Sequence, residues 1–137
     1  MKPGAGNLLI VDDDEATTQT FARMLMLEGH HVRTANNAED GLREADTRPL
    51  DAIILDLRMP LINGLGFLYR LRARENHRST PVVVVTGDYF LNDEMTDELH
   101  ALGVEVRFKP LWLDELADLA RALLSSRQRT QPQPLAS

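Results

Sequence analysis

A run of four consecutive valines, Val82 to Val85, is the feature that most constrains the fold of this 137-residue chain. β-Branched residues favour strands, and a run without alternating polar residues predicts a strand buried on both faces. Leu8–Val11 and Ala52–Leu55 are short apolar runs of the same kind. Because doubly covered strands are typical of parallel sheets with helices on each face, these runs predict an α/β fold.

Segments with apolar residues at helical spacing lie between the apolar runs. The pattern predicts helices at about 15–28, 38–46, 65–75, 92–102 and 113–126, and further strands at 32–35 and 105–108. A strand followed by a helix therefore occurs five times along the chain. This order predicts one five-stranded parallel sheet with right-handed crossovers and helices on both faces.

All predicted elements fall within residues 7–126, so we expect one domain there. Residues 1–6 would form an N-terminal arm, and residues 127–137 a disordered tail or the stub of a linker. The formal net charge of −6 disfavours direct binding to nucleic acid. No apolar run is long enough for membrane insertion, and the first residues lack the apolar core of a secretory signal. The absence of cysteine fits a reducing compartment, and we expect a cytoplasmic location.

Polar side chains follow four of the predicted strands, at the points where these strands end. They are Asp12 and Asp13, Asp56, Thr86 and Lys109. The carboxyl ends of parallel strands share one edge of the sheet, so we expect these side chains to converge. Neighbouring carboxylates repel one another by ~4 kcal/mol per pair at an intermediate dielectric constant. A hard cation with oxygen ligands, such as Mg²⁺, would offset this repulsion, and a carboxylate beside Mg²⁺ and an ammonium group suits phosphoryl transfer.

Five motifs occur in a characteristic order and spacing. They are Leu9-Ile10-Val11-Asp12-Asp13, Ile54-Leu55-Asp56-Leu57-Arg58-Met59-Pro60, Gly64, Pro81-Val82-Val83-Val84-Val85-Thr86-Gly87 and Lys109-Pro110. In these motifs the chain, from about Asn7 to Ser126, resembles the receiver domain of bacterial two-component response regulators. The resemblance implies a flavodoxin-like, doubly wound sheet with strand order 2-1-3-4-5. It also implies a signalling domain rather than an enzyme.

The resemblance assigns a role to each residue at the predicted edge. Asp56 would be the phosphoacceptor, taking the phosphoryl group from a sensor histidine kinase or a phosphotransfer protein. Asp13 would bind Mg²⁺ directly and Asp12 through water, with Asp56 and the backbone carbonyl of Arg58 as further ligands. Lys109 would contact the phosphoryl group. The bond between Lys109 and Pro110 would be cis, as in the family.

The resemblance also implies a conformational switch, in which Thr86 moves toward the phosphoryl group. Val106 occupies the second switch position, where the family usually has tyrosine or phenylalanine, and the aromatic residue stands instead at Phe108. Trp112 lies at a predicted helix start, where small polar residues are usual. If exposed, Trp112 would mark a docking surface, built from 92–102, 105–108 and 113–126, for a downstream protein or a fused output domain. Alternatively, the Trp112 side chain would pack against the last helix.

Further hypotheses concern charged residues, histidines and one glycine. Arg58 and Asp88 each lie two residues beyond a site residue, and we expect them to pair across the mouth of the site and slow dephosphorylation. The four histidines, His30, His31, His77 and His100, lack the spacing of metal ligands and are predicted at the surface or at helix ends. Arg70, Arg72 and Arg74 are predicted to be solvated. Gly64 ends a predicted turn, where glycine can take a positive φ.

Several other functions stay open from the residues. A receiver could be a stand-alone regulator, a phosphorelay intermediate or part of a longer protein. A phosphorylation-independent interaction domain would explain Val106. A flavodoxin-like FMN carrier is disfavoured, because Asp12, Asp13 and Asp14 would repel the FMN phosphate. A metal-dependent phosphatase would ordinarily have a second acid two residues after Asp56, where this chain has Arg58.

Overall fold

The computed structural model describes residues 5–57, 63–87 and 91–130. Its strands are β1 (Asn7–Val11), β2 (His31–Ala35), β3 (Ala52–Leu55), β4 (Val82–Thr86) and β5 (Val104–Phe108). Its helices are α1 (Glu15–Leu27), α2 (Ala38–Thr47), α3 (Gly64–Arg72), the short 3₁₀ helix η1 (Glu75–His77), α4 (Asp93–Ala101) and α5 (Leu113–Thr130). The strands form one parallel sheet in the order β2-β1-β3-β4-β5, which confirms the predicted flavodoxin-like topology.

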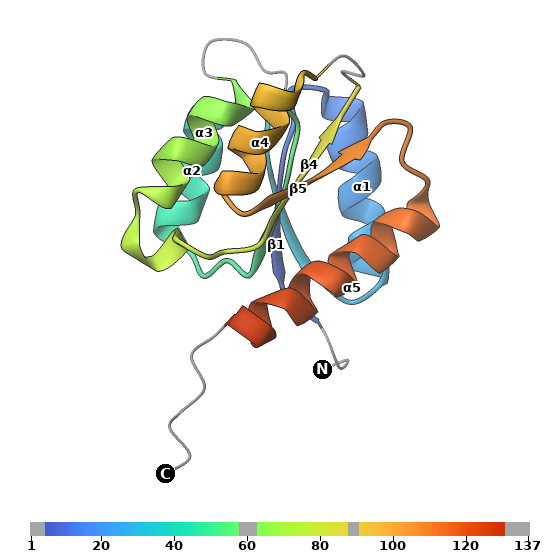
Figure 1. Ribbon diagram of the computed structural model, residues 1–137. Coiled ribbons are helices and arrows are strands. Elements are labelled where there is room, and N and C mark those ends of the chain that lie inside the picture. Colours follow the sequence, from blue (N-terminus) through green and yellow to red (C-terminus); the bar gives the residue numbers. More distant parts are fainter. Residues whose placement is uncertain (1–4, 58–62, 88–90, 131–137) are drawn as a thin grey trace.

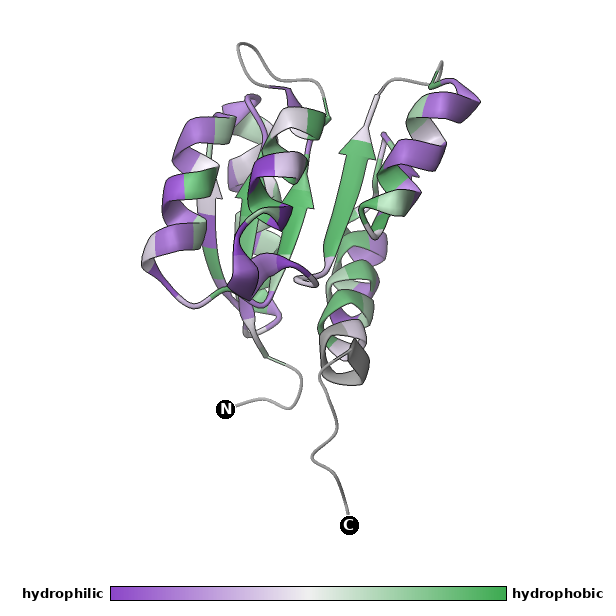
Figure 2. Ribbon diagram, turned by 60° about the vertical axis from the view of Figure 1, so that its left-hand side comes forward, coloured by the Kyte–Doolittle hydropathy of each residue, from purple (hydrophilic) through white to green (hydrophobic). Residues whose placement is uncertain are grey.

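Helices cover both faces of the sheet. Helices α2, α3 and α4 lie on one side and α1 and α5 on the other (Figure 1). The central strands are apolar and lie between the two helix layers, in which polar and apolar residues are interspersed (Figure 2). Of the described residues, no helix combines the length and the hydropathy that crossing a membrane requires.

The core consists of two clusters separated by the sheet. Alternate residues of β4 face opposite sides, so Val82 and Val84 join the cluster under α2, α3 and α4, whereas Val83 and Val85 join the one under α1 and α5. The second cluster contains Leu116, Ala120 and Leu123 of α5, as their spacing predicts. Leu113 has the helical spacing of these inward residues, but it is exposed because it stands in the first turn of α5, beyond the edge of the cluster.

Side-chain caps fix the starts of four helices. Asp14, Asn37, Asn63 and Asn92 each accept a hydrogen bond from a backbone N–H in the first turn of α1, α2, α3 and α4. The hydrogen bond from Thr17 lowers the pKa of the Asp14 carboxyl. At the other end of α1, Gly29 has φ 97°, a left-handed conformation that ends the helix as predicted. Helix α5 continues to Thr130, into the segment predicted as a tail, because the first proline comes only at position 132.

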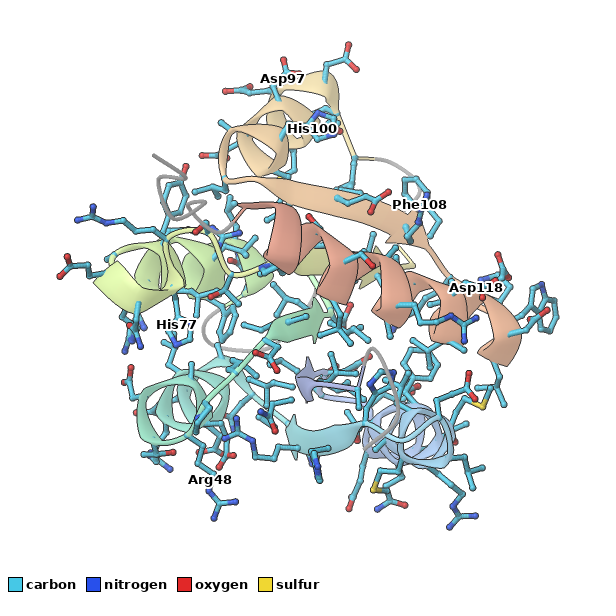
Figure 3. All side chains as sticks on the ribbon, turned by 90° about the horizontal axis from the view of Figure 1, so that it is seen from below. Arg48, His77, Asp97, His100, Phe108 and Asp118 are labelled. Atoms are coloured by element: carbon cyan, nitrogen blue, oxygen red, sulfur yellow. The ribbon has the colours of Figure 1, made fainter. Side chains whose placement is uncertain are left out.

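Two histidines are buried and not at the surface: His77 ends η1 and His30 closely follows α1, so both lie at helix ends, as predicted, but inside the protein. His77 lies between α2 and α3 (Figure 3), with Nδ1 2.8 Å from Thr80 Oγ1 and Nε2 2.9 Å from the Ala45 carbonyl oxygen. His30 Nδ1 accepts a hydrogen bond from the Gly6 backbone N–H at 3.3 Å. Burial lowers the pKa of His30 from its ordinary value of 6.5. Both rings are therefore structural groups of the interior.

Arg72 is also wrongly predicted as solvated. Its Nε donates to the Leu102 carbonyl at 2.9 Å, and its Nη1 donates to the carbonyls of His77 at 2.9 Å and Thr80 at 2.7 Å. The side chain thus joins the end of α3 to the segment before β4 and to the end of α4. These carbonyls attract Arg72 inward because they have few other donors at the ends of their elements.

Candidate functional site

Strand register brings the acidic residues together. Val11 of β1 and Leu55 of β3 are paired, and each precedes a site carboxylate in the sequence. The Asp56 backbone N–H donates to the Val11 carbonyl at 2.8 Å, and the Asp12 N–H to the Ala35 carbonyl at 3.1 Å. The backbone of both aspartates is therefore fixed where neighbouring strands end, at the carboxyl edge of the sheet.

Three carboxylates share this edge. Asp12, Asp13 and Asp56 each place a carboxylate oxygen so that all three atoms lie within 4.8 Å of one another. Asp12 and Asp56 are only 4% and 7% exposed, whereas Asp13 is exposed. Close, partly desolvated carboxylates repel strongly, so the cluster favours a cation with a preference for oxygen ligands.

Lys109 reaches the same carboxylates from β5. Its Nζ lies 3.2 Å from Asp12 Oδ2 and 3.9 Å from Asp56 Oδ1. The Lys109 backbone N–H donates to the Thr86 carbonyl at 2.8 Å, which holds the end of β5 against the end of β4. The Lys109–Pro110 bond is cis, as the family resemblance predicts. One ammonium group beside three carboxylates leaves the cluster negatively charged.

The predicted switch residues lie beside this edge. Thr86 is fully buried and pairs with Phe108 across β4 and β5, while Val106 pairs with Val84. Val106 is partly buried against the cluster under α2, α3 and α4. Phe108, at the end of β5, is 45% exposed. The aromatic ring is therefore adjacent to Thr86 along the sheet, and Val106 lies deeper in the same face.

Gly64 lies against the backbone of the site, and close packing rather than a positive φ requires glycine there. Its φ is not positive, because the described glycines with positive φ are Gly29 and Gly103. Instead, an added Cβ would lie 2.7 Å from Leu57 Cα and 2.9 Å from the Asp56 carbonyl oxygen. Glycine is thus required for close approach to the backbone that carries Asp56.

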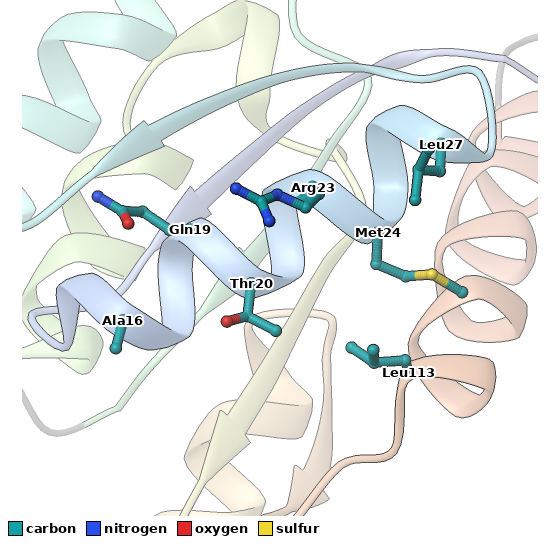
Figure 4. A pocket seen from close by; sticks show the side chains of 7 residues that line it. All are labelled: Ala16, Gln19, Thr20, Arg23, Met24, Leu27 and Leu113. Atoms are coloured by element: carbon teal, nitrogen blue, oxygen red, sulfur yellow. The ribbon is translucent and has the colours of Figure 1, made fainter.

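Trp112 is 66% exposed, which excludes the alternative in which it packs on the last helix. It precedes α5, where its carbonyl accepts from the Leu116 N–H at 2.9 Å and its own N–H donates to Glu115 Oε1 at 3.1 Å. Beside it, Leu113 faces α1 across a groove of about 370 Å³ that Met24 and Leu27 also line (Figure 4). The start of α5 thus presents apolar side chains to solvent.

Two predictions involve residues outside the described part of the chain. Arg58 and Asp88, the expected pair at the mouth of the site, are both outside it, and so is the Arg58 carbonyl that was predicted as a metal ligand. The other predicted site residues all lie in the described part of the chain: Asp12, Asp13, Asp56, Thr86, Val106, Lys109 and Trp112.

An open parallel sheet in this order, with three carboxylates and a lysine at its carboxyl edge, is the arrangement expected of a receiver-type signalling domain. Residues 8–121 match the family model of the response regulator receiver domain, and the chain belongs to this family. Receiver domains are the signalling domains of two-component response regulators. This membership decides against the flavodoxin-like electron carrier.

Three relatives illustrate the range of proteins that contain such a domain. The chain is 37% identical over 124 residues to the transcriptional regulatory protein PrrA of Mycobacterium leprae, covering 90% of this chain and 52% of PrrA. It is 32% identical over 126 residues to the response regulator ArlR of Staphylococcus aureus, covering 92% and 54%. It is 37% identical over 132 residues to the sensory/regulatory protein RpfC of Xanthomonas campestris pv. campestris, covering 91% and 18%. The chain therefore spans about half the length of PrrA and ArlR.

Solved structures show the same fold. The chemotaxis protein CheY4 of Vibrio cholerae superposes with a TM-score of 0.81 at 26% identity, covering 88% of this chain and 99% of CheY4. A response regulator receiver protein from Pseudomonas putida gives a TM-score of 0.79 at 27% identity, covering 86% and 97%.

Proposed function

We propose that Asp56 accepts a phosphoryl group and that the domain signals by the resulting conformational change. The observation that carries the proposal is the convergence of Asp12, Asp13 and Asp56 within 4.8 Å, with Lys109 Nζ 3.9 Å from Asp56. A nearly buried carboxylate beside an ammonium group and two acids is the arrangement that phosphoryl transfer to a carboxylate requires.

In the proposed step, a carboxylate oxygen of Asp56 forms a bond to phosphorus as the bond from phosphorus to the donor breaks. With a phosphohistidine donor, the broken bond is the phosphorus–nitrogen bond, and the donor ring leaves as neutral imidazole after taking up one proton. Lys109 would hold an oxygen of the transferring group, because its Nζ already lies between Asp12 and Asp56. Lys109 thereby reduces the repulsion between the carboxylate and the anionic phosphoryl group.

The residues present fit Mg²⁺. Asp12, Asp13 and Asp56 offer three hard oxygen ligands on one side, and the exposure of Asp13 leaves this side open to water. Bound there, Mg²⁺ would supply positive charge to the phosphoryl oxygens. Asp14 would stay outside the ligand set, because its carboxylate caps α1 by accepting from the Thr17 N–H. The Asp14 N–H also donates to Asp12 Oδ1 at 2.9 Å, which orients the Asp12 carboxylate.

The rest of the proposal concerns partners and readout. The donor would be a sensor histidine kinase or a phosphotransfer protein in the cytoplasm, and one domain at 7–126 would carry the function. Thr86 would move toward the phosphoryl group, and Val106 would allow a shift of the α4–β5–α5 surface. Exposed Trp112 supports this surface as a contact with a downstream protein or output domain. The domain would carry its own transfer chemistry without acting as an enzyme on other substrates.

Intact-mass measurement tests the proposal. The protein is incubated with a small acyl phosphate, with and without Mg²⁺, beside the variants Asp56→Asn and Asp14→Asn. Wild type and Asp14→Asn should gain one phosphoryl group in the presence of Mg²⁺, because asparagine caps a helix as well as aspartate does. Asp56→Asn should gain none. An adduct of wild-type yield in Asp56→Asn, or none in wild type, would contradict the proposal and favour the phosphorylation-independent interaction domain.

A further inference from the structure

A cavity lies at the edge of the sheet opposite to Asp56, where the strands begin. Its volume is about 400 Å³, and it lies between the segment before β4, the turn between α4 and β5, and the end of α5. Arg72, Arg78, Ser79, Gly103 and Ser126 are among its lining residues, and none of the described lining residues carries a carboxylate. We refer to it as the basal pocket.

Arg72 supplies a charge that its bonding partners do not neutralise. Its three hydrogen bonds, from Nε and Nη1, all end on backbone carbonyls, which are dipoles without net charge. Within the described residues, Nη2 makes no hydrogen bond. Nη2 lies 3.8 Å from the position of a Cβ added at Gly103, so it stands next to a residue that lines the pocket.

The other partly buried arginines do have counter-charges. Arg33 Nη1 lies 3.0 Å from Glu44 Oε1, and Arg74 Nε lies 2.5 Å from Asp46 Oδ1. Among the described residues, Arg72 is the partly buried arginine without an ion pair. Burial lowers the pKa of the Arg72 guanidinium from its ordinary value. A half-buried cation of this kind gains stability when an anion approaches it.

Arg78 adds a second cation to the same lining. It is exposed and forms no ion pair with the part of the chain that the structure describes. Ser79 beside it offers a hydroxyl donor. Two guanidinium groups on one cavity are notable in a chain with a net charge of −6, because carboxylates are abundant elsewhere on the surface. The position therefore concentrates positive charge and hydrogen-bond donors.

We propose that the basal pocket binds a small ligand through one oxyanion group, a phosphate or a carboxylate, held by Arg72 and Arg78. The guanidinium fork matches the geometry of both groups. The cavity volume lies within the range of small-molecule sites, about 300–1,000 Å³. The pocket is on the sheet edge opposite to Asp56, so the ligand is separate from the phosphoryl group proposed at the acidic edge.

Nuclear magnetic resonance titration tests this site. The ¹⁵N-labelled protein is titrated with inorganic phosphate, and separately with acetate, without Mg²⁺ and at constant ionic strength. The amide signals of Ser79 and Gly103 should shift and saturate, while those of Asp13 and Lys109 should not follow the same curve. Saturation by phosphate alone identifies a phosphate site, and saturation by acetate alone identifies a carboxylate site. Saturation by each of the two anions identifies a site that binds oxyanions without distinguishing phosphate from carboxylate.

Two variants with the same charge change separate specific binding from general attraction. Arg78→Gln leaves the three Arg72 hydrogen bonds intact and should weaken binding about tenfold, because one charged hydrogen-bond partner is lost. Arg70→Gln, on the exposed face of the same helix as Arg72, should bind as the wild type does. The proposal is overturned if Ser79 and Gly103 show no saturable shift with either probe. It is also overturned if Arg78→Gln binds like wild type, or if Arg70→Gln weakens binding equally.

Discussion

The variant Gly64→Ala examines how closely α3 approaches the backbone of the phosphoacceptor. The added Cβ would lie 2.7 Å from Leu57 Cα, 2.9 Å from the Asp56 carbonyl oxygen and 3.1 Å from the Leu57 carbonyl oxygen. Carbon atoms pack best at roughly 3.5–4.0 Å, so the start of α3 and the Asp56–Leu57 segment must separate by about 1 Å. All three neighbours are backbone atoms, so no side-chain rotation relieves the contact.

The expected loss of stability is about 1–2 kcal/mol. Overpacking in a close-packed site costs roughly 1–3 kcal/mol. Alanine in place of glycine recovers up to ~1 kcal/mol of helix propensity, and less at the first helical position than in the middle of a helix. The displacement also strains the hydrogen bond of 2.8 Å from the Gly64 N–H to the Leu57 carbonyl. We therefore expect slower acyl-phosphate labelling of Asp56 as well as lower stability.

Urea denaturation measures the first effect and intact mass after labelling measures the second. Gly87→Ala is the matched control, because a Cβ at Gly87 meets nothing within 4 Å. The control should be unchanged or up to about 1 kcal/mol more stable, since alanine restricts the unfolded chain. If Gly64→Ala is as stable as Gly87→Ala, the close approach at Asp56 is not a constraint and the reasoning fails.

Two further predictions concern the buried histidines. Burial lowers the pKa of His30 below 6.5, so the unfolded state binds more protons and wild-type stability falls as pH decreases through and below that value. Urea denaturation at a series of pH values measures this fall in the free energy of unfolding. The fall should be shallower for His30→Gln than for wild type, and unchanged for the exposed control His100→Gln. Equal slopes for His30→Gln and wild type would contradict the role given to His30. Thr80→Ala removes the hydroxyl bonded to His77 Nδ1 and should cost about 1–2 kcal/mol, against a much smaller loss for the exposed Thr47→Ala; equal losses would mean that the buried bond is unimportant.

The fold and the acidic edge were predictable because they depend on local patterns. The valine run at 82–85 specifies a doubly covered strand wherever it occurs, and parallel topology then places the residues after each strand on one edge. Asp56 and Lys109 are far apart in the sequence, yet both follow predicted strands. Their meeting therefore required only the strand order, which the resemblance to the receiver family supplied.

The contacts of His77, Arg72 and Gly64 were not predictable in the same way. His77 binds the carbonyl of Ala45, 32 residues away, and Arg72 binds that of Leu102, 30 residues away. A backbone carbonyl has no identity in the sequence, so no residue pattern marks it as a partner. For Gly64, the sequence shows a glycine after a proline-containing turn, and this signal is the same for positive φ as for close packing. Only the atomic distances distinguish the two reasons.

The sheet divides the core into two separately packed halves. Alternation along β4 places Thr86 on the side of Val82 and Val84, which belongs to the α2–α3–α4 layer. Val106 is on that side as well, whereas the groove between α1 and the start of α5 is on the other. If Thr86 moves toward a phosphoryl group, as proposed, it moves on the face packed under α2, α3 and α4, whereas α1 and α5 pack on the opposite face. A partner seated on α1 and a partner that reads α4 would consequently bind the same molecule without competing for its surface.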